Sequence, residues 1–222
     1  MKKILAVITA VALLATVCTL FTGCNSNSIK QMLSGKEPES IAVSGGWGLA
    51  SSPVITDELQ AIFDKATEAL AGATLTPVAY IGSQVVAGMN HRFLCKAAAT
   101  VPDATAEYVV VTIYEKLDDT AEITSIVKND VEVPESGLVG GWSEAETPVV
   151  TDEAKAALEK AGKAVKDTTY TPIALVATQI VSGTNYCILC EVNGGFESFV
   201  YVYADLNGKA EITDTAAFTS EY

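Results

Sequence analysis

The segment QVVAGMNHRFLC, residues 84–95, recurs as QIVSGTNYCILC, residues 179–190. The two segments lie 95 positions apart (179 − 84 = 95), and the same offset carries Gly45-Gly46-Trp47 onto Gly140-Gly141-Trp142. Self-similarity at a fixed spacing indicates a duplicated structural unit. Each copy has about 80 to 90 residues, which is enough for one hydrophobic core.

The spacing between the copies changes once. Residues 121–124 (AEIT) match residues 210–213 (AEIT) at an offset of 210 − 121 = 89, so the second copy is shorter by 95 − 89 = 6 residues. The difference falls near residues 101–106, a polar stretch that contains a proline. Such a stretch predicts a loop, where a change of length costs little.

A helix is expected near the start of each copy. Thr56 is a suitable N-cap residue, and Asp57 and Glu58 place negative charge in the first helical turn. Apolar residues follow at helical spacing, namely Leu59, Ile62, Phe63, Ala66, Ala69 and Leu70. Four strand-like runs come next, at 75–87, 90–99, 108–116 and 122–127. The pattern predicts an α+β fold of two domains, each with one helix packed on an antiparallel sheet of four to five strands.

The run at 90–99 allows its two faces to be assigned, because alternate residues of a strand point to opposite sides. The side expected to meet the helix carries His91, Phe93, Cys95 and Ala97. The other side, expected to point outward, carries Arg92, Leu94 and Lys96.

The N-terminus has the pattern of an export signal. A basic start at Met1-Lys2-Lys3 precedes an apolar run at residues 4–21, and small residues then lead to Cys24. The segment Phe21-Thr22-Gly23-Cys24 resembles the lipobox of bacterial lipoproteins. The resemblance implies a signal peptide at 1–23 and an exported protein, anchored through lipidated Cys24 to the outer face of a bacterial-type membrane. The apolar run is close to spanning length, so plain secretion or a retained membrane helix is the alternative.

The mature chain is expected to divide into four parts. Residues 24–43 are polar and low in aromatic residues, which favours a flexible tether. The two copies form domains at 44–131 and 139–222, and residues 132–138, with a proline and a glycine, form a short linker.

The charge balance is strongly acidic. The sequence has 14 Lys and Arg residues and 27 Asp and Glu residues, for a formal net charge of −13. Removal of the signal peptide takes away Lys2 and Lys3 and no acidic residue, which leaves 12 − 27 = −15. An acidic surface repels nucleic acid, so no nucleic-acid partner is expected.

The cysteines do not predict a disulfide framework. Cys18 leaves with the signal peptide and Cys24 carries the lipid, so Cys95, Cys187 and Cys190 remain, an odd number. The last two lie three residues apart in an expected strand and would point to opposite faces. Ordinary apolar packing is therefore expected for all three.

The residues of a catalytic site are lacking. The one histidine, His91, is replaced by Tyr186 in the second copy, and it lies roughly 13 Å along an expected strand from Cys95. A nucleophile and its base need hydrogen-bond contact, at about 3 Å. No metal-ligand cluster of His and Cys and no glycine-rich phosphate loop is present. We therefore expect no enzyme activity, no metal and no cofactor.

The repeated hairpin segment resembles a known inhibitory motif. Residues 84–88 and 179–183 both have the form Gln-x-Val-x-Gly, and Thr184-Asn185-Tyr186 follows the second copy. In this the sequence resembles the cystatin superfamily, and stefins and plant cystatins in particular. The resemblance implies a thiol protease inhibitor that binds papain-type cysteine proteases reversibly and without covalent chemistry.

The resemblance also implies three contacts with the protease in each copy: an N-terminal trunk, a first hairpin and a second hairpin. In the first copy these residues are Val43, Gly45 and Gly46, then Gln84, Val85, Val86, Ala87 and Gly88, and finally Leu117 and Asp118. In the second copy they are Val139, Gly140 and Gly141, then Gln179, Ile180, Val181, Ser182 and Gly183, and finally Leu206 and Asn207.

The second hairpin departs from the family pattern. It keeps Leu117 and Leu206 but lacks the proline and the aromatic residue or histidine that the family carries there. The alternative function is therefore a non-inhibitory surface module of the same kind, used for adhesion or complex assembly.

Overall fold

A computed structural model describes residues 45–101, 103–132 and 140–218. The segments expected to form a signal peptide and a tether, together with Cys24, Val43 and Val139, lie outside the described residues. Both copies, called the first and second repeat below, fall within one compact unit. Within the described ranges, no helix is both long enough and apolar enough to cross a membrane.

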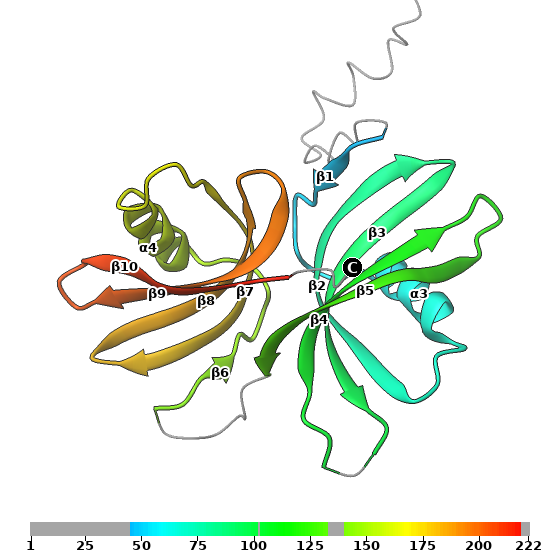
Figure 1. Ribbon diagram of the computed structural model, residues 1–222, viewed down its shortest axis with the longest axis horizontal. Coiled ribbons are helices and arrows are strands. Elements are labelled where there is room, and N and C mark those ends of the chain that lie inside the picture. The colour runs from blue at the N-terminus through cyan, green and yellow to red at the C-terminus, as the bar shows by residue number, and fades with distance from the viewer. Residues whose placement is uncertain (1–44, 102, 133–139, 219–222) are drawn as a thin grey trace, which may run out of the picture. The chain divides into compact units, whose positions relative to one another are not determined.

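The first repeat forms a five-stranded antiparallel sheet in the order β1-β2-β3-β4-β5 (Figure 1). Its elements are β1 (Trp47–Leu49), α3 (Asp57–Thr67), β2 (Ala73–Val86), β3 (Gly88–Ala99), β4 (Glu107–Glu115) and β5 (Ala121–Glu132). Each expected strand run overlaps one of these strands, and the largest difference is at the end of β5, which continues to Glu132.

The second repeat forms a sheet of the same topology, in the order β10-β9-β8-β7-β6. Its elements are β6 (Ser143–Glu144), α4 (Asp152–Gly162), β7 (Tyr170–Val181), β8 (Gly183–Val192), β9 (Phe196–Asp205) and β10 (Ala210–Ala217). In both repeats the helix lies between the first and second strands in sequence.

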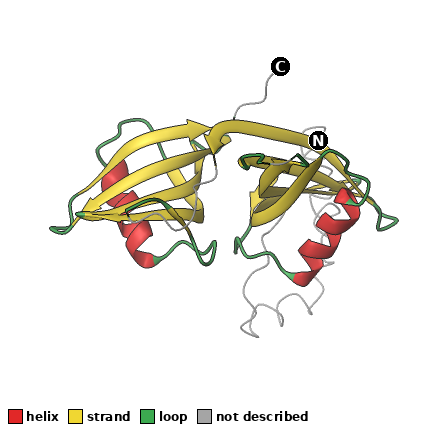
Figure 2. Ribbon diagram, turned by 90° about the horizontal axis from the view of Figure 1, so that it is seen from below, coloured by secondary structure: helices red, strands yellow, loops and turns green. Residues whose placement is uncertain are grey.

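The two helices begin where the sequence predicts. The side-chain oxygen of Thr56 accepts a hydrogen bond from the Leu59 amide at 3.3 Å, and that of Thr151 accepts from the Ala154 amide at 3.2 Å. These bonds satisfy amide groups that have no partner inside the helix. Figure 2 shows each helix, in red, along one face of its sheet.

The helix-facing side of β3 is as expected. Phe93 and Cys95 are buried in a cluster with Ile62 and Phe63 of α3, and Ala97 packs against it. The second repeat has the corresponding cluster, which includes Cys190 and Leu158.

The other side of β3 is not outward-facing. Leu94 is fully buried, while Arg92 and Lys96 make ion pairs with Glu197 and Glu144 at 2.5 and 2.7 Å. Leu94 belongs to a hydrophobic cluster with members from both repeats, among them Ala79, Tyr108, Val110, Ile173, Leu189 and Phe199. The prediction is wrong because residues of the other repeat pack against this face. The periodicity of one strand does not show which residues pack against it.

The expected α+β class is wrong. Strands account for 53% and helices for 13% of the structure, which is mostly β, with two five-stranded antiparallel sheets and only two helices among the described residues. One helix on one sheet per domain is not an adequate description, because the face of each sheet away from the helix is also a packed layer. Strand β4 shows this directly, since residues 108–111 are all buried.

Candidate binding edges

The described residues that are expected to contact a protease in the first repeat gather at one end of its sheet, where the hairpins turn. The amide of Gly45 donates to the carbonyl of Val85 at 3.1 Å, which places the glycines beside the β2–β3 hairpin. Met89, at the start of β3, pairs with Glu115, the last residue of β4. The β4–β5 turn therefore lies next to the β2–β3 turn, as Figure 1 also shows.

We call this surface the first edge and define it as residues 45–46, 84–88 and 117–118. The second edge is residues 140–141, 179–183 and 206–207. It is assembled in the same way: the side chain of Gln179 donates to the carbonyl of Gly140 at 2.9 Å, and Gly183 pairs with Asp205 of β9. Whether these residues bind a protease stays a prediction.

Glycine is required at the first hairpin of each edge. Gly88 and Gly183 have φ angles of +136° and +138°, which favour glycine over all other residues. A Cβ atom at these positions would lie 2.4 Å from the carbonyl oxygen of Glu115 and 2.3 Å from that of Ala204. The hairpin tips can lie against the next strand only because these side chains are absent.

A tyrosine holds each of these tips. The hydroxyl of Tyr114 donates to the carbonyl of Ala87 at 2.6 Å, and that of Tyr203 donates to the carbonyl of Ser182 at 2.7 Å. Sequence reasoning missed both residues. The available signal was that Tyr114 maps onto Tyr203 at the offset of 89 (203 − 114 = 89).

The first hairpins expose apolar side chains at their tips. Val86 of the first edge is exposed, and so are Ile180 and Val181 of the second edge. Ile180 is the most exposed of the three, at 69%. Exposed apolar side chains that gather at one place make these tips a candidate contact surface.

The second hairpins expose leucine on rigid turns. Leu117 and Leu206 are each 86% exposed. The carboxylate of Asp205 accepts from the amides of Asn207 and Lys209 at 2.9 and 2.7 Å. In the first repeat the Asp118 carboxylate accepts from both the amide and the hydroxyl of Thr120, which fix the turn and hold the pKa of Asp118 below its usual value.

The helices also support these second turns. Lys65, in the last turn of α3, donates to the carbonyl of Asp119 at 3.2 Å. Lys160 of α4 donates in the same way to the carbonyl of Gly208. Each exposed leucine therefore stands on a turn that both its own hydrogen bonds and the helix hold in place.

An amide pair joins the glycines to the first hairpin. Asn90 donates to the side-chain oxygen of Gln84 at 2.8 Å, and Gln84 donates to the carbonyl of Gly45 at 3.2 Å. In the second edge Asn185 donates to Gln179 at 2.7 Å, and Gln179 in turn donates to Gly140.

The tryptophans that follow the glycines pack on the sheets. Trp47 lies under the guanidinium of Arg92, at 4.2 Å from the ring centre. Trp142 meets Tyr201 edge to face, with ring centroids 5.6 Å apart. These contacts anchor the chain directly after each glycine pair.

His91 is part of a polar cluster of the first repeat rather than a nucleophile–base pair. Its Nδ1 lies 2.9 Å from the Tyr80 hydroxyl, and its Nε2 lies 3.2 Å from the Glu115 carboxylate. Burial lowers the pKa of His91, although the hydrogen bond and charge of Glu115 oppose the shift. Burial also raises the pKa of the Cys95 thiol well above its usual value, which leaves a poor nucleophile.

The other two cysteines lie on opposite faces of β8, as expected. Cys187 belongs to the cluster shared by the repeats, and Cys190 belongs to the cluster under α4. Burial raises the pKa of Cys187 to about 12, so its thiol stays protonated at neutral pH. Among the described residues no group of three or more His, Cys, Asp or Glu side chains could hold a metal ion.

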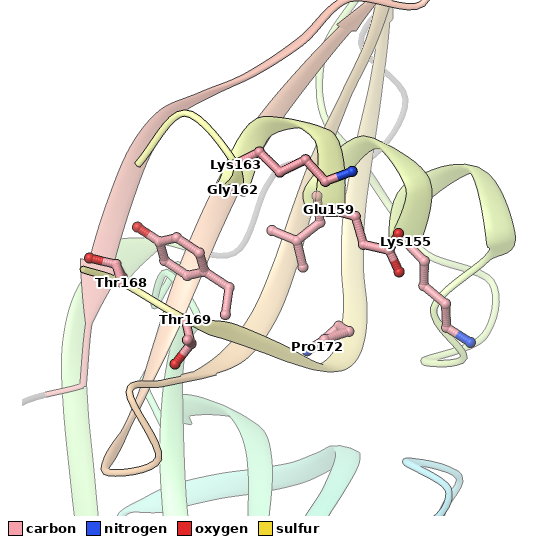
Figure 3. A pocket seen from close by; sticks show the side chains of 9 residues that line it. Lys155, Glu159, Gly162, Lys163, Thr168, Thr169 and Pro172 are labelled. Atoms are coloured by element: carbon pink, nitrogen blue, oxygen red, sulfur yellow. The ribbon is translucent and has the colours of Figure 1, made fainter. Parts of the chain in front are cut away.

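A pocket of about 400 Å³ lies between the end of α4 and the start of β7 (Figure 3). Leu158, Tyr170 and Pro172 contribute to its walls, and Lys163 reaches across the helix beside it. At the offset of 95, Leu158 corresponds to Phe63 of the first repeat. Neither histidine nor cysteine is among the residues that line the pocket.

A scan against known family models finds no match for this sequence, and no curated protein matches it.

Proposed function

We propose that the protein is a reversible, non-covalent inhibitor of papain-type cysteine proteases, and that each edge enters the active-site cleft of a protease. The proposal is supported above all by the two edges, each of which combines a glycine trunk with two hairpins that expose apolar tips. The resemblance of residues 84–88 and 179–183 to the Gln-x-Val-x-Gly motif supplies the class of partner.

The edges would act by filling the cleft. The Val86 and Val181 side chains, exposed in the free protein, would be buried against the protease, and apolar burial would supply the binding energy. Because the tips are already held by Tyr114 and Tyr203, little conformational entropy would be lost on binding. Inhibition of this kind would need no covalent reaction by any side chain of the inhibitor.

The second edge should bind more tightly than the first. Its first hairpin exposes both Ile180 and Val181, whereas the first hairpin of the first edge exposes Val86 and keeps Val85 half-buried. Burial of one more side chain of this size stabilises a complex by about 1.5 to 3 kcal/mol. The expected difference is roughly one to two orders of magnitude in the inhibition constant.

The test is an inhibition constant for the mature chain and its variants against several papain-type proteases. Val86→Asp and Val181→Asp should each disable one edge by burying an unpaired carboxylate, with a loss of at least about 100-fold for that edge. The matched control is Val101→Asp, since Val101 is 62% exposed and lies beyond the opposite end of β3. The double variant Val86→Asp/Val181→Asp should not inhibit at all, and full inhibition by this variant would refute the assignment of the edges.

A surface module for adhesion or complex assembly is the second candidate. It is favoured by the second hairpins, whose tips present Asp118 and Asn207 beside the leucines in place of a proline and an aromatic residue. If the mature chain inhibits none of several papain-type proteases at micromolar concentrations, the edges serve such a partner instead.

The proposal includes a lipid tether at Cys24, which would hold the inhibitor at the cell surface. Replacement by Cys24→Ala should release the protein from the membrane fraction or block its maturation. Unchanged fractionation of this variant with membranes would instead support a retained apolar helix.

A further inference from the structure

The amide pair at each edge is built in the same way in both repeats. Gln84 and Asn90 are directly opposite each other on β2 and β3, and Gln179 and Asn185 are opposite each other on β7 and β8. The residues beside the asparagine have changed, since Met89 and His91 correspond to Thr184 and Tyr186. The hydrogen bonds from asparagine to glutamine to the glycine carbonyl are nevertheless present in both repeats.

The direction of these bonds gives the asparagine a specific role. A glutamine side chain has one oxygen that accepts and one nitrogen that donates, and the two can exchange places by a half-turn of the amide. Because Asn90 donates to the Gln84 oxygen, the Gln84 nitrogen must face the carbonyl of Gly45. If the Gln84 amide were reversed, its side-chain oxygen would face the carbonyl oxygen of Gly45, and neither atom can donate a hydrogen bond.

The glycine held by this bond is the point where the trunk joins the edge. Gly45 and Gly140 have φ angles of +86° and +74°, and a Cβ atom built at either position would meet nothing within 4 Å. Two hydrogen bonds hold Gly45: its backbone amide donates to the Val85 carbonyl, and its carbonyl accepts from the Gln84 side chain. Loss of the second hydrogen bond would leave Gly45, within the part of the chain that the structure describes, with the hydrogen bond from its amide to Val85.

We propose that Asn90 and Asn185 are positioning residues, which set the glutamine amide and thereby hold the glycine trunk against the first hairpin for partner binding. The inference rests on the proposed function for its partner, a papain-type protease, but the positioning itself can be measured without one. The variants are Asn90→Ala, which removes the donor, and Asn90→Asp, which is nearly the same size but can only accept. The aspartate should draw the Gln84 nitrogen toward itself and turn its oxygen toward Gly45.

The first measurement is hydrogen exchange at the Gly45 amide in the free mature chain. Both variants should speed this exchange by roughly two- to tenfold, as expected for one lost hydrogen bond, and Asn90→Asp should have the larger effect. Exchange in the second repeat should stay unchanged. The control is Asn193→Asp in the β8–β9 turn of the second repeat. The Asn193 side-chain oxygen accepts from the Thr169 amide, and aspartate keeps that acceptor.

The second measurement is the inhibition constant in a Val181→Asp background, where only the first edge is active. The constant should rise by a similar factor, and the urea midpoint of the chain should fall by no more than the loss of one hydrogen bond accounts for. Unchanged exchange at Gly45 would overturn the positioning role, and so would weaker inhibition without faster exchange, which would make Asn90 a direct contact. Faster exchange with unchanged inhibition would also overturn it. If exchange quickens but the parent chain inhibits no protease, positioning of the trunk stands and the proposed function fails.

Discussion

Gly88 and Gly183 allow the first-hairpin tip of each edge to lie against the next strand. Glycine permits a positive φ and a close approach of the backbone, and the structure shows both at Gly88 and at Gly183. The tyrosines that donate to the tip carbonyls could not be predicted in the same way. Their role depends on the register of β3 with β4 and of β8 with β9, which is a long-range property.

Alanine at Gly88 or Gly183 should destabilise the protein strongly. The added Cβ would meet a backbone carbonyl and a tyrosine ring, so strain and steric overlap together should cost about 2 to 5 kcal/mol in the free energy of unfolding. Gly72→Ala is the matched control, because Gly72 has a φ of +83° but open space around it, and about 1 kcal/mol is expected there. Urea denaturation of the three variants measures the difference, and equal losses would show that the contact with the next strand does not matter.

His91 should make stability depend on pH. The pKa of His91 in the folded protein lies below its usual value of about 6.5, so the unfolded chain binds more protons in this range and folding weakens as the pH falls below about 6.5. Tyr80, Glu115 and, at longer range, Glu58 are the groups that act on it. The loss is at most about 1.4 kcal/mol per pH unit for one proton. In His91→Phe the free energy of unfolding should fall less between pH 7 and pH 5 than in the parent, and equal slopes would show that His91 does not contribute.

Local sequence signals predict the helices and the long strands. The N-cap threonines, the helical spacing and the hairpin turns are all short-range features, and each has its counterpart in the structure. The short strands β1 and β6 were missed, because three and two residues carry no periodicity of their own. The outward side of β3 was assigned wrongly, because its neighbours come from the other repeat.

Substitutions in the second hairpins should weaken inhibition while leaving the free energy of unfolding almost unchanged. Leu117 and Leu206 contact little else in the free protein, so Leu117→Ser and Leu206→Ser should change the free energy of unfolding by less than about 0.5 kcal/mol. Each should still weaken inhibition at its own edge by roughly tenfold or more, as expected for loss of a buried leucine at an interface. Inhibition constants and urea midpoints of the same samples test this, and unchanged inhibition would remove the second hairpin from the contact surface.

At the scale of the whole molecule, the two repeats share apolar surface. The rings of Tyr108 and Phe199 meet edge to face with centroids 5.2 Å apart, and both are almost fully buried. Ion pairs such as Arg92–Glu197 join the repeats beside this cluster. Repetition in the sequence indicates two copies of one pattern. It does not reveal this shared surface, because alternating apolar residues on a strand do not show which residues pack against each face.

The shared cluster predicts that the repeats unfold together. Phe199→Ala should lower the free energy of unfolding by about 3 to 5 kcal/mol, because it leaves a cavity among residues of both repeats. The chain has two tryptophans, Trp47 in the first repeat and Trp142 in the second, so the variants Trp142→Phe and Trp47→Phe each keep one fluorescent reporter. Both reporters should give the same urea midpoint, and Phe199→Ala should move both midpoints equally. If Phe199→Ala moves only the midpoint reported by Trp142, the repeats unfold as independent domains despite the shared surface.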